Sequence, residues 1–378
     1  MELVEARDVR HVIVHREEHG YCAHAHAAVA ADGTWLVVFN HAPRRAFVLH
    51  PPEEPLFRNM MIRSADQGAT WSAPQVVPDY RFSGTECAGL TPLSNGTVLL
   101  SQWRFAWYPL DLARRMPDQT GLSYPDEFMR GWMASPEHEA SAFRNVDPAV
   151  LAPWVRGPGE TWVHRSDDFG ASFSETILID TAPFSGGYAM RSGVELLDGT
   201  VLLLMSDIPH YRQIFAIRSA DCGRTWSAAS LVAALDGHEF EEPALVRTAS
   251  GRLVAVLREN VSRRLHQVKS DDGGATWSRP HKLDISGYPA HLALLDDGRL
   301  LMTCGWRQPD YGIRAVFSSD DGGSWNIDQT IRIRGGLPNR NLGYPATIRA
   351  DDGTFHTVYY GEDGAGLTCI MATSWRLP

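Results

Sequence analysis

The sequence of 378 residues predicts an all-β fold, a six-bladed β-propeller of four-stranded antiparallel blades with an insertion in blade 2. Two interleaved repeats support this prediction. The first is the motif Ser-x-Asp-x-Gly-x-x-Trp, and the second is an Asp-Gly-type turn followed by an apolar strand. Both recur at intervals of about 50 residues, which is the length of one four-stranded propeller blade.

The first repeat places an aspartate in each of five turns. The motif is complete at Asp66, Asp221 and Asp272, whereas at Asp168 a Phe replaces the Trp. The fifth copy is assigned to Asp321, with one residue missing before its Trp. In such a turn the carboxylate accepts backbone N–H groups and the glycine adopts a positive φ. We therefore expect these aspartates to be structural.

The second repeat consists of six turns, whose glycines are Gly33, Gly96, Gly199, Gly251, Gly298 and Gly353. An apolar run such as residues 201–205 follows each turn and predicts a strand. Six turns indicate six blades and a single domain over residues 1–378, although the length alone favours two or three domains. We expect the N-terminal strand 11–15 to complete the last blade, because closing the ring removes exposed strand edges.

The insertion follows from the interval between Asp66 and Asp168, which is about twice the others. It is predicted at about residues 107–159, where prolines and short helix-like segments replace the blade pattern. A segment of this length is expected to form a lid over one face of the propeller.

Composition and charge exclude several classes of protein. The formal net charge of -10 disfavours nucleic acid and anionic membranes as partners. The five cysteines are scattered without a CxxC pair, which argues against a disulfide framework or a structural zinc site. The N-terminus has no basic, apolar leader, so we expect a cytoplasmic location. No cofactor is expected, and the oligomeric state is not predicted.

Polar residues interrupt the otherwise apolar strands seven to ten positions before the turn glycines. They are His24, His26, Glu86, Arg191, Glu241, Glu242, His291 and Tyr344. Because the innermost strands of a propeller surround one axis, these side chains are expected to converge on a single pocket. Most of the 12 tryptophans are expected in the core, but Trp also forms walls that stack on sugars, so a carbohydrate is the expected partner.

The Ser-x-Asp-x-Gly-x-x-Trp repeat resembles the Asp box of the sialidase superfamily. The resemblance implies a six-bladed propeller whose boxes lie on the face away from the active site. The stretch from Glu242 to Arg258 resembles the sialidase segment that carries a Glu and one arginine of the carboxylate-binding triad. Arg314 resembles a second triad arginine, and Gly343-Tyr344-Pro345 resembles the segment of the nucleophilic Tyr.

The resemblance implies that Tyr344 is the nucleophile and Glu242 its base, with Glu241 as a substitute. A neutral Tyr avoids the repulsion that a carboxylate nucleophile would meet at an anionic sugar. The chain departs from the family at two places. Residues 21–27 lack the first triad arginine, and no Asp lies between Phe39 and Ser64 to serve as acid/base.

Other residues are candidates for the vacant roles. His24 or His26 is the predicted acid/base, and both side chains of this His-x-His pair are expected on one face of a strand. Arg104, Arg191 or Arg307 is predicted to add a basic contact, and Tyr288 to contact the sugar. A divalent metal held by the His pair with Glu86 or His291 is the alternative, but we predict no metal.

The leading prediction is a glycoside hydrolase that acts on a sialic-acid-like or uronic-acid-like sugar. The first alternative is a uronate lyase, in which Tyr or His removes the proton next to the carboxylate and arginines stabilise the enolate. The second alternative is a carbohydrate-binding propeller without catalytic activity.

Overall fold

A computed structural model describes the chain except residues 1, 46–52, 79–82, 130–132, 134–142 and 209. The described residues form six sheets, each one blade of a propeller, so the predicted all-β six-bladed fold is confirmed. No helix among them is both long enough and apolar enough to cross a membrane.

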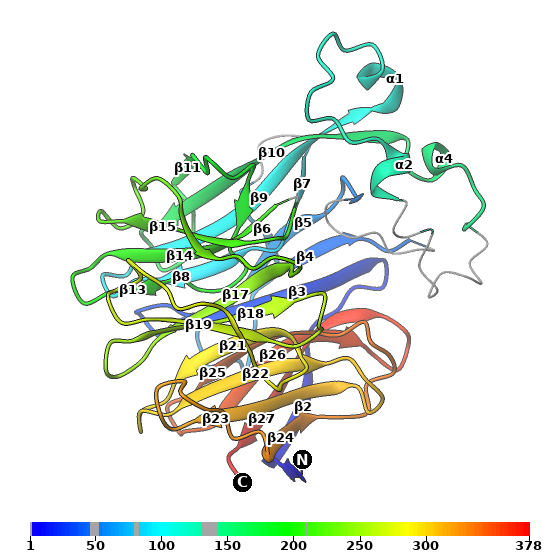
Figure 1. The fold of residues 1–378 in the computed structure, drawn as a ribbon. Helices are drawn as coiled ribbons and strands as arrows, with labels where there is room; N and C mark the ends of the chain where they lie inside the picture. Colours follow the sequence, from blue (N-terminus) through cyan, green and yellow to red (C-terminus); the bar gives the residue numbers. More distant parts are fainter. Residues whose placement is uncertain (1, 46–52, 79–82, 130–132, 134–142, 209) are drawn as a thin grey trace.

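The first three blades follow one another along the chain (Figure 1). Blade 1 contains β3 (Gly20–Val29), β4 (Trp35–Pro43), β5 (Arg58–Ser64) and β6 (Gln75–Val76). Blade 2 contains β7 (Ser83–Thr85) and β8 (Gly89–Pro92), which both pair with β9 (Val98–Pro109), then β10 (Trp154–Ser166) and β11 (Glu175–Ile179). Blade 3 contains β12 (Gly187–Tyr188) and β13 (Val194–Glu195), which pair with β14 (Val201–Asp207), then β15 (Ile214–Ser219) and β16 (Ser230–Ala233).

The last three blades include the N-terminal segment. Blade 4 contains β17 (Phe240–Arg247), β18 (Leu253–Glu259), β19 (His266–Ser270) and β20 (His281–Lys282). Blade 5 contains β21 (Tyr288–Leu294), β22 (Leu300–Trp306), β23 (Gly312–Ser318) and β24 (Gln329–Arg334). Blade 6 contains β25 (Gly343–Arg349), β26 (Phe355–Glu362) and β27 (Thr368–Arg376), with β2 (Arg7–His15) as its fourth strand.

The N-terminal segment joins two blades. Strand β2 pairs antiparallel with β27, and β1 (Glu2–Glu5) pairs parallel with β24 of blade 5. The two ends of the chain therefore meet, and Arg7 Nε donates to the carbonyl of Leu377 at 2.6 Å. This pairing covers the edges of β24 and β27, which would otherwise be open to association with another chain.

The hydrophobic core lies between blades rather than within them. Strand β14 is buried along its whole length, because both faces of its blade pack against neighbours. Val256 of blade 4, for example, shares one cluster with Met302 of blade 5. This double-sided burial explains why the second strands read as continuous apolar runs instead of alternating patterns.

The Asp boxes repeat one hydrogen-bond pattern. In the first box, Ser64 Oγ donates to Asp66 Oδ1 at 2.8 Å, and that carboxylate accepts the N–H of Thr70 at 2.8 Å. Ser64 pairs with Trp35, at the end of the sheet opposite to Gly20. The boxes therefore lie on the face away from the beginnings of the innermost strands.

The fifth box corrects the prediction for Asp321. Here Ser318 Oγ donates to Asp320 Oδ1 at 2.8 Å, and Asp320 accepts the N–H of Ser324 at 2.8 Å. Asp321 occupies the next position with a φ of 52°. The motif is thus complete, from Ser318 to Trp325, and Asp320 is the structural aspartate.

The insertion is shorter at both ends than predicted. Strands β9 and β10 extend beyond the blade and still pair at Pro109 and Trp154, so the insertion comprises residues 110–153. It carries α1 (Leu110–Ala113), α2 (Pro125–Phe128) and α4 (Pro148–Leu151) and projects beside β9 and β10 in Figure 1. Residues 130–132 and 134–142 lie outside the described part. The indole of Trp154 donates to the carbonyl of Glu53, which ties the base of the insertion to blade 1.

Candidate active site

Three innermost strands begin with the same backbone irregularity. His24 in β3, Glu242 in β17 and Tyr344 in β25 have φ values of 53°, 51° and 55°, and the strand register shifts around each of them. A non-glycine residue in this left-handed region costs on the order of 1 kcal/mol or more. Strain of this kind concentrates at functional sites. Here it occurs at equivalent positions of blades 1, 4 and 6.

Tyr344 and Glu242 meet at the centre of the ring. The Tyr344 hydroxyl donates a hydrogen bond to Glu242 Oε1, and Arg258 donates to Glu242 Oε2 at 2.8 Å. The backbone N–H of Glu242 donates to Ser206 Oγ at 2.7 Å, which fixes the position of the bulge. Burial, reinforced by Glu242, raises the pKa of Tyr344 well above its usual value. The phenol is therefore neutral, and Glu242 is placed to accept its proton.

Glu241 lies on the other side of Arg258. Arg258 Nε is 3.0 Å from Glu241 Oε1, and Asn260 donates to the same oxygen at 2.6 Å. Burial raises the pKa of Glu241. In this structure Glu242, rather than Glu241, contacts the Tyr344 hydroxyl.

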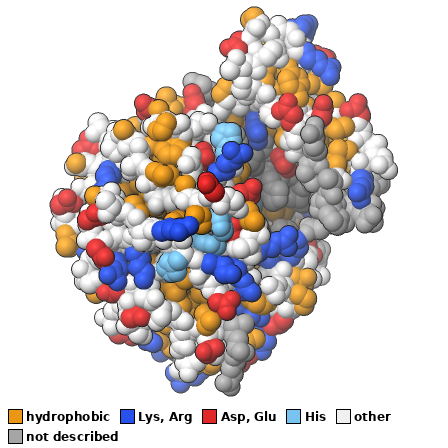
Figure 2. All heavy atoms as spheres, viewed as in Figure 1, with side chains coloured by type: hydrophobic (Ala, Val, Ile, Leu, Met, Phe, Trp, Pro, Cys, Tyr) orange, Lys and Arg blue, Asp and Glu red, His pale blue; other side chains and the backbone are white. Residues whose placement is uncertain are grey.

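Three arginines surround the two inner tyrosines. The guanidinium carbons of Arg191 and Arg307 lie 6.0 and 5.9 Å from the centre of the Tyr344 ring, and that of Arg258 lies 4.9 Å from the Tyr288 ring. These distances permit cation–π contacts. In the view of Figure 2, basic and histidine side chains gather near the middle of this face.

Arg191 differs from the other two arginines because its guanidinium group lacks hydrogen-bond partners among the described residues. Its side chain is 3% exposed, and none of its three nitrogens has a hydrogen-bond partner among the described residues. Burial lowers its pKa to about 10, so it remains charged at neutral pH. An unpaired buried charge is unfavourable, and an anionic ligand would remove that cost.

The other two predicted arginines lie outside this group. Arg314 on β23 stacks on Trp306, with its guanidinium carbon 3.5 Å from the ring centre. Arg104 on β9 lies over Trp162 at 5.9 Å. Neither contact involves Tyr344 or Glu242, whereas Arg191 and Arg307, which were also predicted to bind substrate, lie beside Tyr344.

Glu86 approaches the centre from blade 2. It is 5% exposed, and its carboxylate accepts hydrogen bonds from the Tyr211 hydroxyl at 3.2 Å and from the N–H of Cys87 at 3.3 Å. Burial raises the pKa of Glu86 to about 7, and the negative charges of Glu242 and Glu241 act in the same direction. A carboxyl with this pKa is suited to exchange protons near neutral pH.

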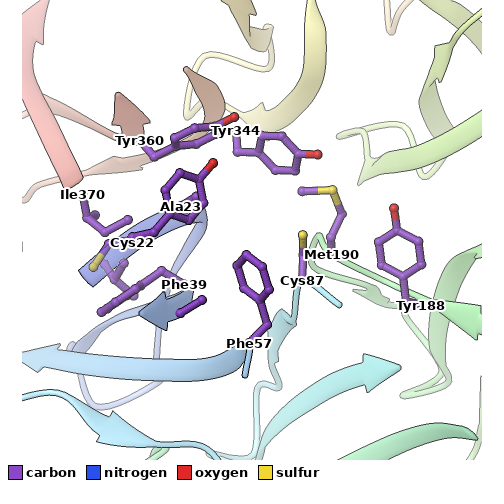
Figure 3. Close-up of a cluster of buried hydrophobic side chains, with 14 of the residues drawn as sticks. Cys22, Ala23, Phe39, Phe57, Cys87, Tyr188, Met190, Tyr344, Tyr360 and Ile370 are labelled. Carbon is purple, nitrogen blue, oxygen red and sulfur yellow. The ribbon is translucent and has the colours of Figure 1, made fainter. Parts of the chain in front are cut away.

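Tyr211 was not predicted from the sequence. It lies in the loop between β14 and β15, with a φ of 52°, and the strand periodicity gives no signal for such a position. Figure 3 shows residues from four blades that belong to one buried cluster: Tyr344, Tyr188, Met190, Cys87 and Phe57. The centre of the ring is thus aromatic and apolar around its charged groups.

His24 is attached to a buried chain of amides. Its ring lies 4.6 Å from that of Tyr344, and its Nδ1 is 3.1 Å from Asn40 Oδ1. Asn40 donates through Nδ2 to Asn59, so its Oδ1 is an acceptor and the Nδ1 of His24 carries the proton. The protein therefore fixes both the orientation and the tautomer of His24.

His26 does not share this environment, contrary to the prediction for the His-x-His pair. The bulge between Ala23 and His26 breaks the alternation of the strand. His26 Nδ1 accepts the N–H of Leu90 at 3.1 Å, and burial beside Arg191 lowers its pKa well below the usual value. The ring centre of His291 lies 6.2 Å from that of His26, and burial lowers the pKa of His291 to about 3. Both rings are neutral acceptors beneath the catalytic candidates.

Possible metal-binding groups lie elsewhere among the described residues. The two sets of three close ligand atoms are His15, Glu17 and Cys22, and His238, Glu259 and His266. Neither includes the residues of the metal alternative, His24, His26, Glu86 and His291. All five cysteines are free, and burial raises the pKa of Cys22 and Cys87.

Comparisons with known proteins place the chain in a family. Residues 135–357 match the model of the BNR repeat-like domain, whereas no curated protein matches significantly. A protein of unknown function from Dyadobacter fermentans is 22% identical, with a TM-score of 0.80 over 98% of this chain and 100% of that one.

Two similar structures are named enzymes. The NanB sialidase from Streptococcus pneumoniae is 13% identical, with a TM-score of 0.67 over 97% of this chain and 70% of that one. An α-L-arabinanase from Penicillium chrysogenum is 12% identical, with a TM-score of 0.61 over 97% of both chains. At such identities the similarity is one of fold. With its repeats, its blades and the match over more than half of its length, the chain belongs to the BNR repeat-like family, and it shares the six-bladed fold with the sialidase and the arabinanase.

Proposed function

We propose that this protein is a glycoside hydrolase acting on an anionic sugar of the sialic-acid or uronic-acid type. The observation that carries the proposal is the hydrogen bond from Tyr344 to Glu242 beside three arginines, one of which, Arg191, has no partner among the described residues. Sialidase and arabinanase neighbours support a sugar-cleaving role.

In the proposed reaction the arginines bind the sugar carboxylate through paired N–H donors. Glu242 accepts the phenolic proton while the Tyr344 oxygen attacks the anomeric carbon and the glycosidic bond breaks. Glu86, in its protonated form, donates its proton to the departing oxygen. The products of this step are a tyrosyl-linked sugar and a free alcohol.

The second step reverses these roles. Glu86, now a carboxylate, removes a proton from water as the water oxygen attacks the anomeric carbon. The bond to Tyr344 breaks, and Glu242 returns its proton to the phenolate. The configuration of the sugar is retained because two displacements occur. This assignment places the acid/base on Glu86 of blade 2, where the sequence prediction had His24 or His26.

Hydrolysis of sialosides and uronate oligosaccharides tests the proposal. Tyr344→Phe should reduce kcat by at least about 10³-fold, because the nucleophile is lost. Tyr359→Phe is the matched control, since the hydroxyl of this tyrosine of β26 shares a hydrogen bond with Thr373 Oγ1 at 2.9 Å instead of contacting Glu242. Turnover that survives Tyr344→Phe, or that Tyr359→Phe abolishes equally, contradicts the assignment.

The position of His24 favours a uronate lyase as the second candidate. Its ring packs against Tyr344, and its protonated Nδ1 leaves Nε2 as a potential base. A lyase would remove the proton next to the carboxylate and expel the glycosidic oxygen, giving an unsaturated product that absorbs in the ultraviolet. His24→Gln should abolish a lyase but leave a hydrolase with much of its kcat, whereas Glu86→Gln should impair the hydrolase.

A further inference from the structure

One cavity adjoins the candidate active site. It has a volume of about 480 Å³ and lies between the loops of blades 4 and 5 and the segment before β25. Arg258, Tyr288 and Arg307 line it and also surround the candidate active site. A cavity of this volume accommodates a sugar-sized group, and the shared arginines place it beside Tyr344 and Glu242.

The lining of this cavity is strongly basic. Besides Arg258 and Arg307 it includes Arg263 and Arg340, and none of the described residues that line it is Asp or Glu. This contrasts with the chain as a whole, whose net charge is -10. Arg258 is already paired with Glu241 and Glu242, so the attraction for an anion comes from the other basic residues of this lining.

Two of these arginines keep their charge available. Arg307 donates to the carbonyl of Leu342 at 2.9 Å and to the hydroxyl of Tyr360 at 3.2 Å, which orient it without neutralising it. Arg263 is exposed and adopts a φ of 57°. Within the described residues, neither of them has a carboxylate at ion-pair distance.

Aromatic side chains form the remaining walls. Tyr288, Trp306 and Tyr311 line the cavity. Arg314 stacks on Trp306 at 3.5 Å, which fixes that indole. Aromatic faces pack against the C–H faces of sugar rings, whereas a bare inorganic anion needs only the charges. The combination of aromatic walls and guanidinium groups fits an acidic sugar.

We propose that this cavity is a second subsite for an acidic sugar, so that the preferred substrate contains two adjacent acidic units. This inference rests on the proposed function for the assignment of the first sugar to Tyr344. The recognition itself needs no catalysis: Arg263 and Arg340 bind the second carboxylate, and Tyr288 and Trp306 contact the ring. Neither Arg263 nor Arg340 belongs to the catalytic group.

Binding titration of the Tyr344→Phe protein tests the subsite without turnover. The probes are pairs with the same first sugar: α2,8-linked disialic acid against 3′-sialyllactose, and digalacturonic acid against its reducing-end methyl ester. The dianionic member of a pair should bind about 10-fold more tightly or better, as expected for one charge-assisted contact. Arg263→Gln combined with Arg340→Gln should remove this preference.

Arg264→Gln is the matched control. It removes one charge from the same loop, but Arg264 faces Asp284 at 3.7 Å and does not line the cavity. This variant should keep the preference. Equal binding of both members, a preference that survives the double substitution, or no binding of any probe overturns the subsite.

The same set of measurements separates the two proposals. If the wild-type protein hydrolyses the substrates without any preference for the dianionic member, the subsite fails and the hydrolase stands. If the preference depends on Arg263 and Arg340 but no probe is cleaved, the subsite stands and the hydrolase fails.

Discussion

Glu86→Gln tests the proposed acid/base through two independent measurements, stability and activity. The substitution keeps the shape of the side chain and an acceptor for Tyr211, but it removes the titrating carboxyl. Burial raises the pKa of Glu86 from 4.5 to about 7 in the folded protein. The folded state therefore binds this proton more tightly than the unfolded chain does.

The sign of the stability effect follows from this difference. The stabilisation from the bound proton is complete below about pH 4.5 and is lost as the pH rises to about 7. At about 1.4 kcal/mol for each tenfold change in proton affinity, the loss amounts to ~3 kcal/mol. Between pH 4.5 and 7, the free energy of unfolding of the wild-type protein should fall by ~3 kcal/mol relative to that of Glu86→Gln. At higher pH the difference between the two proteins should stay constant.

Urea unfolding at several pH values measures this difference in stability. The pH dependence of kcat/KM over the same range tests whether Glu86 is the acid/base. The wild-type rate should fall above about pH 7, where Glu86 no longer holds its proton. The variant should lose this alkaline limb together with about 10²–10⁴-fold in rate. Glu195→Gln removes a carboxylate that binds Ser94 at the opposite end of a blade and should leave the limb in place. An unchanged limb in Glu86→Gln would refute the reasoning.

Three further predictions test single contacts. Arg191→Met should raise the melting temperature, because it removes an unpaired buried charge, and should raise KM for acidic sugars at least about 10-fold; a lower melting temperature with unchanged KM contradicts it. Tyr211→Phe deletes a hydrogen bond to the Glu86 carboxylate, so the pKa of Glu86 and the alkaline limb of the pH–rate profile should move upward. Asp320→Ala should destabilise the protein by about 1–3 kcal/mol in urea unfolding. Asp321→Gly, at a residue with a φ of 52°, should cost little or add stability, and the opposite ranking would restore the original assignment of the fifth box.

The fold could be predicted because a propeller repeats its signals. The turn glycines mark one position in every blade, and the Asp boxes mark another. An ambiguous copy of either motif can therefore be assigned from its position relative to the other copies. The fifth Asp box was misassigned because the sequence itself is doubled there, at Ser318-Ser319-Asp320-Asp321-Gly322-Gly323. Both frames contain Ser, Asp and Gly at the right spacing, and only the hydrogen bonds of Asp320 distinguish them.

The candidate site could be predicted in part. Counting back from the turn glycines located Glu86, Arg191, Glu242 and Tyr344, because all innermost strands begin at one end of the ring. Residues that reach the centre from loops, such as Tyr211, have no such register. Strand periodicity also does not predict β-bulges. For this reason His24 and His26 were expected on one face of β3, although a bulge lies between Ala23 and His26.

The departures from the sialidase pattern have a structural reason that follows from the symmetry of the ring. His24, Glu242 and Tyr344 occupy equivalent bulges in three blades, so any of them presents a side chain to the same axis. A charge that is absent from one blade can then be supplied by another without moving the backbone. Arg191 of blade 3 and Arg307 of blade 5 approach Tyr344 where blade 1 offers His24 instead of an arginine. Glu86 of blade 2 supplies a carboxyl where the stretch from Phe39 to Ser64 has no Asp. Loss of family motifs in one blade is therefore compatible with a complete set of catalytic groups, provided that the groups are counted around the axis rather than along the sequence.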